Sequence, residues 1–168
     1  MKSLAAALCA ILMASCAGYH LGTDKPAPLS AVKSIAVPMM TNETLHPRAE
    51  ILATSELANA ITTDGTYRLA AATDADAVLV AAIKEIRYEA IRSRRLDTLR
   101  PEELSNTVII GWELRDGRDP KQVLISGSSQ GFSQLFADTD LQTARNNALP
   151  DALARACVGV VSTLANGF

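Results

Sequence analysis

Residues 77–92 have the sequence AVLVAAIKEIRYEAIR, a long run in which residues that favour extended backbone are frequent. The first half is apolar at every position, which is typical of a strand covered on both faces. The second half alternates polar with apolar residues, which is typical of a strand with one face in water. The pattern predicts one long strand in the middle of a sheet. The residues expected to share its apolar face, interrupted by Lys84, are Val78, Val80, Ala82, Ile86, Tyr88 and Ala90.

Shorter strands are predicted on both sides of this one. Before it lie β-favouring runs at residues 32–39 and 67–71, and after it lie similar runs at residues 107–115 and 122–132. The sequence DGRDP at residues 116–120 separates the last two runs and predicts a hairpin turn between them. In the strand at 107–115, the side chains expected on one face are Val108, Ile110, Trp112 and Leu114. Residues 93–105 are highly charged and are expected to form a loop.

Two amphipathic helices are predicted, at residues 47–63 and 138–166. In the first, Ala49, Ala53, Leu57 and Ile61 recur every four residues and form one apolar stripe. In the second, Pro150 should kink the helix or begin a second segment. The order β-α-β-β-β-β-α predicts an α+β two-layer sandwich, with two amphipathic helices packed on one face of a mixed or antiparallel sheet of about four strands.

The N-terminus has the features of an export signal that ends at a cysteine. Lys2 precedes an apolar run at residues 4–14, which is shorter than the roughly 20 residues that a membrane-spanning helix needs. The four residues Met13-Ala14-Ser15-Cys16 resemble the lipobox of bacterial lipoproteins. The resemblance implies that residues 1–15 are a cleaved signal peptide and that Cys16 is acylated. Residues 16–30 then form a linker, and residues 31–168 form a single domain.

The lipobox resemblance also has consequences for localisation. Bacterial lipoproteins carry more than one acyl chain, which is enough for stable anchoring. Ala17 follows the cysteine where an aspartate would resemble an inner-membrane retention signal. The expected location is therefore the outer membrane, with the domain facing the periplasm. The covalent lipid on Cys16 is the only non-protein group that we expect.

Enzymatic and metal chemistry are not expected. The sequence GSSQG at residues 127–131 matches a nucleophile-elbow pattern, but both histidines, His20 and His46, precede it, whereas the elbow requires a later histidine. The alternative is a strand of small residues that lets another backbone or a partner come close. Asp74 and Asp76 lack a third metal ligand at useful spacing. The formal net charge of −2 argues against a nucleic-acid partner.

An arginine cluster follows the long central strand and is a candidate binding site for lipopolysaccharide. Its members are Arg92, Arg94 and Arg95. Arginine binds phosphate through a planar fork, so a local cluster can hold an anionic glycolipid despite a negative net charge. The alternative is a solvated loop whose charge is balanced by the neighbouring acids Asp97, Glu102 and Glu103.

Several motifs, in order, resemble the LptE family of lipopolysaccharide-assembly lipoproteins, and the C-terminal helix resembles its verrucomicrobial-type branch. The matching segments are residues 16–21 (CAGYHL), 35–38 (IAVP), 41–44 (TNET), 64–69 (DGTYRL), 74–79 (DADAVL) and 148–150 (ALP). The resemblance implies two helices on a four-stranded sheet and a non-enzymatic role. Such a protein plugs the lumen of the LptD β-barrel, helps it assemble and helps lipopolysaccharide reach the outer leaflet.

A plug must present a polar, adaptable surface to a polar barrel lumen. The candidate surface includes the hydroxyl-rich strand around residues 126–133, and Ser128 and Gly131 are the candidate barrel contacts. The arginine candidates rest on charge alone, because the sequence around Arg92 does not match the family's motifs. A second hypothesis is an adaptor lipoprotein that regulates a peptidoglycan synthase or forms part of a secretion complex. Lipoproteins of that kind share a similar opening of strand, turn and helix.

Overall fold

The sheet is built on one long strand, as residues 77–92 predicted. The computed structural model describes residues 25–93, 101–136 and 141–167. Strand β4 (Ala77–Ser93) pairs antiparallel with β5 (Pro101–Asp116), and β5 pairs antiparallel with β6 (Val123–Phe136). A short 3-10 helix, η2 (Ala27–Leu29), precedes the sheet.

Three short strands complete the sheet on the other side of β4. Strands β1 (Ser34–Ala36) and β2 (Thr41–Asn42) each pair with β4 in the parallel sense, and β3 (Arg68–Leu69) pairs in the same sense with β1. The main path of the sheet is β3-β1-β4-β5-β6, and β2 lies off it. The sheet is mixed, as expected, but has six strands rather than about four. Strand β3 lies inside the predicted run at residues 67–71, whereas β2 was not predicted, because a strand of two residues is too short to show a period.

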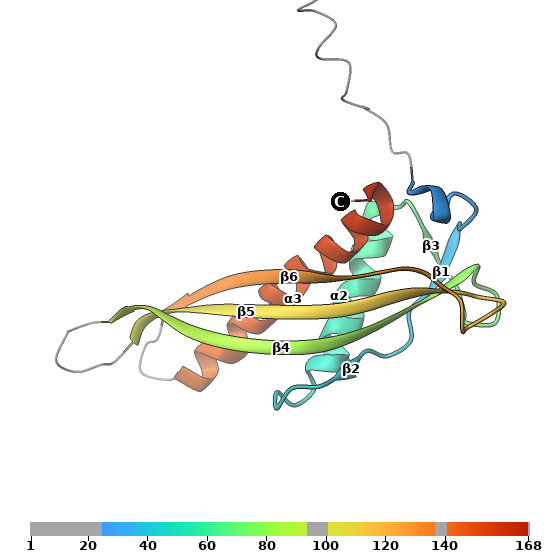
Figure 1. Ribbon diagram of the computed structural model, residues 1–168. Coiled ribbons are helices and arrows are strands. Elements are labelled where there is room, and N and C mark those ends of the chain that lie inside the picture. Colours follow the sequence, from blue (N-terminus) through green and yellow to red (C-terminus); the bar gives the residue numbers. More distant parts are fainter. Residues whose placement is uncertain (1–24, 94–100, 137–140, 168) are drawn as a thin grey trace, which may run out of the picture.

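Two helices pack on one face of this sheet, which confirms the predicted α+β two-layer class (Figure 1). Helix α2 spans Ala49–Asp64 and buries the stripe that its four-residue spacing predicted: Ala49, Ala53, Leu57 and Ile61. Helix α3 spans Leu141–Asn166 and continues through Pro150, so no second segment begins there. Residues 148–165 of α3 supply most of its buried side chains, and this packing offsets the one hydrogen bond that proline cannot make.

Helix α3 is the core helix of the domain. By length and hydropathy it could cross a bilayer, but 56% of its most apolar window is buried inside the protein. Its Cys157 is fully buried, and burial, together with the charge of Glu56, raises the pKa of this thiol to about 12. Cys157 is therefore a small residue of the buried core.

A β-bulge at Lys84 corrects the predicted faces of β4. Ile83 lies opposite Ile110 of β5, and Glu85 lies opposite Ile109, so Lys84 is an extra residue in the ladder. Before the bulge the buried side chains are the odd-numbered ones, Ala77, Leu79, Ala81 and Ile83. After it the inward positions are the even-numbered Ile86 and Tyr88, which pack against the core clusters. The predicted stripe is therefore wrong for Val78, Val80 and Ala82, which lie on the opposite face from Ile86.

The strands also run further than predicted. Pairing between β4 and β5 continues to Ser93 opposite Pro101, so residue 93 and residues 101–105 of the expected charged loop are strand, and residues 94–100 lie outside the described residues. Strand β6 reaches Phe136 rather than residue 132. On β5 the prediction holds, because Val108, Ile110, Trp112 and Leu114 are all buried on one face.

Candidate functional site on the uncovered face of the sheet

The helices cover one face of the long strands, and among the described residues no element covers the other, which we call the open face. The registers of β4, β5 and β6 place its residues in rows across the three strands. From the hairpin end, the rows are Val80-Glu113-Ser126, Ala82-Gly111-Ser128, Glu85-Ile109-Gln130, Arg87-Thr107-Phe132 and Glu89-Ser105-Gln134. The open face therefore mixes hydroxyl, amide and apolar side chains with a few charges.

The charges on this face are paired with one another. Arg115 donates to Glu113 at 2.8 Å, and Arg87 lies 3.3 Å from Glu85 and 3.5 Å from Glu89. Lys84 pairs with Glu43, which follows β2. All of these side chains are about half exposed, so each pair contributes little stability. Their consequence is electrostatic, because the acids offset the basic residues and leave no strong field of one sign.

A shallow hollow of about 430 Å³ lies on the open face at the centre of the sheet. Gly111 is part of its wall, and the alkyl chain of Lys84 lies across it, 3.1 Å from where a β-carbon on Gly111 would stand. The remaining wall includes both apolar and polar side chains, among them Val80, Ala82, Glu113 and Ser126. The hollow is open to solvent and adaptable, since its most intrusive side chain is a flexible lysine.

Strand β6 contributes the uncharged part of the open face. Its sequence VLISGSSQGFSQLF contains no charged residue. The side chains at 126, 128, 130, 132, 134 and 136 are all exposed, including Phe132 at 52% and Phe136 at 72%. Ser128, a predicted barrel contact, is in this exposed set. Phe132 is the last residue of the strand predicted at residues 122–132, and Phe136 lies beyond it.

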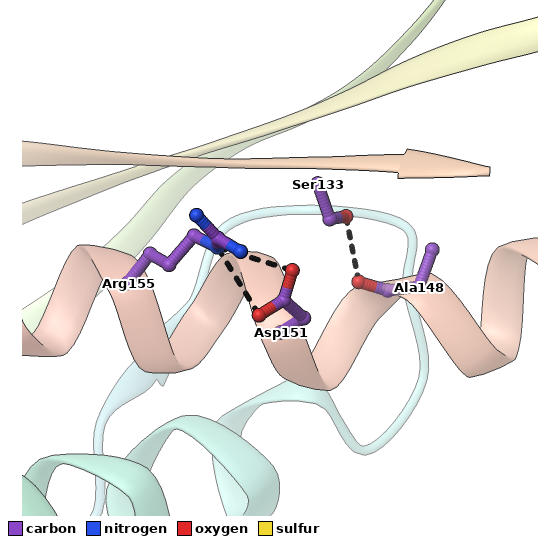
Figure 2. A network of polar contacts seen from close by, with 4 residues as sticks. All are labelled: Ser133, Ala148, Asp151 and Arg155. Atoms are coloured by element: carbon purple, nitrogen blue, oxygen red, sulfur yellow. Dashed lines mark hydrogen bonds and ion pairs between the residues drawn. The ribbon is translucent and has the colours of Figure 1, made fainter.

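Gly131, the other predicted barrel contact, lies on the covered face of β6. A β-carbon on Gly131 would stand 2.0 Å from the carbonyl oxygen of Ala152 in α3, so the helix backbone rests directly on this glycine. Ser129 donates to the carbonyl oxygen of Ala156 at 2.8 Å, and Ser133 donates to that of Ala148 at 2.7 Å (Figure 2). Gly131 is therefore a packing residue, and a substitution there would disturb the fold before it reached a partner.

These contacts also give a role to the GSSQG sequence. Steps of two residues along β6 match steps of four residues along α3, because both cover about 6 to 7 Å. The small residues thus let a helix approach a strand closely, which was the alternative interpretation of the motif. The hydroxyl of Ser129 is engaged by a helix carbonyl. Asp76, one of the two aspartates considered as metal ligands, is also hydrogen bonded within the fold. Its carboxylate accepts hydrogen bonds from the Lys33 and Ser34 amides at 3.0 and 2.9 Å.

The remaining predicted site residues are only partly covered by the structure. Arg92 lies near the end of β4, with its backbone in register with Glu103. Arg94, Arg95 and Cys16 lie outside the described residues, so the arginine cluster and the lipid site remain predictions. Among the described residues, no group of three or more acidic, histidine or cysteine side chains is arranged to hold a metal ion.

A polar cluster on the covered side was not expected from the sequence. His46 Nε2 lies 3.1 Å from the Tyr88 hydroxyl, and the Arg145 guanidinium lies over the Tyr88 ring, 5.0 Å from its centroid. Burial lowers the pKa of His46, and the charge of Arg145 lowers it further. The cluster joins the loop before α2, strand β4 and the first turns of α3. No sequence pattern links these residues, since they come from three distant segments.

Comparison with known proteins places the fold but not a family. No protein-family model matches the sequence, and no characterised protein matches it at the sequence level. Solved structures match over most of their length. The protein XCC0632 from Xanthomonas campestris, of family model DUF330, is 14% identical, with 84% of this chain and 90% of that chain covered and a TM-score of 0.58.

Two further solved structures resemble this chain to a similar degree. A minor lipoprotein from Acinetobacter baumannii is 8% identical, with 80% of this chain and 93% of that chain covered and a TM-score of 0.55. The protein CT253 from Chlamydia trachomatis is 10% identical, with coverages of 82% and 100% and a TM-score of 0.53. At these identities the likeness shows the fold alone. The solved structures that share it include bacterial lipoproteins.

Proposed function

We propose that this chain is an outer-membrane lipoprotein of the LptE type. Its Cys16 carries the lipid anchor, its domain faces the periplasm, and its open face lies against the lumen of an LptD-type β-barrel. In that position it plugs the barrel, helps it assemble and assists the insertion of lipopolysaccharide into the outer leaflet. This role needs no catalysis and no cofactor beyond the covalent lipid.

The observation that supports this proposal most strongly is the chemistry of the open face. The lumen of an outer-membrane barrel is polar, so a plug must meet many donors and acceptors without burying an unpaired charge. Serine and glutamine both donate and accept hydrogen bonds, and they occupy the exposed positions 126, 128, 130 and 134 of β6. The charges on the neighbouring strands are already paired. The face therefore suits a polar wall.

The lipid anchor and the fold agree with this placement. Residues 13–16 resemble a lipobox, and the fold is shared with solved bacterial lipoproteins. A polar face on a tethered domain also fits an adaptor that binds a periplasmic enzyme. Nothing in the geometry of the open face favours the adaptor role specifically. Recovery of a periplasmic enzyme in place of a barrel would point to it.

A charge added at Ser128 tests the proposal. Ser128 is exposed in the central row beside Gly111, so Ser128→Arg adds an unpaired cation to the open face without touching the core. We expect at least about tenfold less β-barrel to co-purify, which corresponds to about 1.4 kcal/mol. Ser55→Arg is the matched control, because Ser55 is exposed on α2. A folded Ser128→Arg variant that retains wild-type recovery of the barrel would contradict the proposal.

A further inference from the structure

Strand β6 is the last strand of the sheet on the main path. It pairs with β5 on one side, and no described strand pairs with its other side. An edge strand of this kind presents a row of unpaired main-chain donors and acceptors. Figure 1 shows β6 as one of the three long strands, running beside β5 over most of its length.

The hydrogen bonds show which residues of β6 point their main-chain groups outward. In an antiparallel ladder the N–H and C=O of one residue point to the same neighbour, and successive residues alternate between neighbours. The Gly117 amide bonds to Asp76 before β4 at 2.9 Å, and the Asp116 amide bonds to Gln122 before β6 at 3.0 Å. Even-numbered residues of β5 therefore bond toward β6. They are in register with odd-numbered residues of β6, so the even-numbered ones point outward.

The outward residues carry none of the features that normally prevent edge pairing. Natural edge strands are protected by charges, prolines or bulges. The outward residues of β6 are Ser126, Ser128, Gln130, Phe132 and Gln134, and they are all exposed. The strand contains neither charge nor proline, and its only register shift lies near its start, opposite Leu114 and Arg115. We call the outward main chain of residues 126–134 the β6 edge. Its composition favours pairing with another extended segment.

Helix α3 limits what can pair there. Its backbone rests directly on Gly131, and the contacts of Ser129 and Ser133 keep it over β6 for several residues. A second copy paired edge to edge would lie about 4.8 Å away and would bring its own α3 to a similar separation. Packed helices need about 8–10 Å between their axes. The β6 edge therefore fits an extended segment that carries no helix on its covered face.

We propose that the β6 edge binds an extended segment of the barrel partner as an added strand, through main-chain hydrogen bonds. The identity of that partner rests on the proposed function. The wall of a closed barrel has no free edge, so the added strand would come from a loop that reaches into the lumen. Main-chain pairing would supply affinity, and the exposed Phe132 beside the edge would contact alternate side chains of the added strand.

A proline at position 128 separates this pairing from a side-chain contact. The Ser128 amide points away from β5, so Ser128→Pro removes an outward donor and leaves the ladder with β5 intact. Ser128→Ala removes the hydroxyl but keeps the amide. Both variants of the full-length lipoprotein are isolated from their own membranes, and the co-purified barrel is measured. We expect the loss for proline to exceed the loss for alanine by at least about tenfold.

The other outcomes are distinct. Equal losses for both variants would assign the contact to the side chain and overturn the added strand, whereas the plug role would stand. Wild-type recovery of the barrel by a folded proline variant would overturn it in the same way. If the wild-type chain recovers no barrel, the proposed function fails, and the pairing fails with it.

Hydrogen–deuterium exchange tests the same pairing without a variant, in case the proline chain does not fold. The amides of Ser126, Ser128 and Gln130 should exchange quickly in the isolated protein and slowly in the complex with the barrel. The amides of Gly127 and Ser129, which bond to β5, should be slow in both samples. Fast exchange of the outward amides in the complex would overturn the proposal.

Discussion

At the scale of single residues, one seam of small side chains sets the distance between the two layers. Gly131 meets the α3 backbone, and Ser129 and Ser133 bond to helix carbonyls on either side of it. The sequence indicated that small residues here would allow a close approach. It could not show whether a helix of the same chain or a partner makes that approach, because the composition needed is the same.

Adding one methyl group to this seam should be costly. In Gly131→Ala the new β-carbon would overlap backbone atoms of Ala152 and Ala156, which cannot move aside independently. We expect the free energy of unfolding to fall by about 3 kcal/mol, at the upper end of the usual cost of overpacking. Urea denaturation measures this change.

Gly111→Ala is the matched control for this substitution. Its β-carbon would meet only the flexible chain of Lys84, so the loss should be below about 1 kcal/mol. Equal losses for the two glycines would show that α3 does not rest on β6 as closely as described.

The His46 cluster should make stability depend on pH. The folded state lowers the pKa of His46, mainly by burial and further by Arg145, so the folded protein prefers the neutral imidazole. The stabilisation is then complete above the ordinary value of 6.5 and decreases as the pH falls below it. We expect a lower urea midpoint at pH 5.5 than at pH 7.5, and a smaller difference in His46→Asn. An unchanged pH dependence in that variant would contradict this assignment.

At the scale of the elements, the Lys84 bulge explains why one face was predicted incorrectly. The first half of β4 is apolar at every position, so its sequence is compatible with either phase. The second half has a clear alternation, and extending that phase backward places Val78, Val80 and Ala82 inside. One extra residue reverses the phase, and a period-two pattern cannot detect it within an apolar run.

Deleting Lys84 should therefore damage the protein far more than truncating its side chain. Without the bulge, the residues after position 84 would exchange faces and direct Glu85, Arg87 and Glu89 toward the helices. We expect the deletion variant to lose cooperative thermal unfolding, as followed by circular dichroism. Lys84→Ala removes only the exposed pair with Glu43 and should cost less than about 1 kcal/mol. A cooperative melt of the deletion variant near the wild-type temperature would show that the bulge does not set the phase.

At the scale of the whole molecule, the order and class of the long elements could be predicted from the sequence. Hydrophobic periodicity predicted the buried stripe of α2 and the buried face of β5 around Trp112. The residue types at 116–120 predicted the hairpin turn after β5. Strand β3 lies inside the predicted run at residues 67–71, but β2 could not be predicted, because tertiary pairing holds its two residues extended without a local pattern. The open face was only partly foreseen, since its residues become neighbours through register.

The anchor should depend on one cysteine and not on the fold. Cys16 lies outside the described domain, whereas Cys157 is buried in α3. In Cys16→Ala we expect loss of acylation and release of the protein from outer membranes, measured by membrane fractionation and mass determination. Cys157→Ala is the matched control and should remain in the membrane. Retention of Cys16→Ala in salt-washed membranes at the wild-type level would contradict the lipoprotein assignment.

The most direct test of the proposed function is affinity isolation of the tagged, full-length protein from its own outer membranes in mild detergent. The bound proteins are identified by mass, and their ratio to the chain is quantified. The plug role predicts one large β-barrel at close to one copy per chain. Recovery of a peptidoglycan synthase, or of no barrel at all, would contradict it and would favour the adaptor.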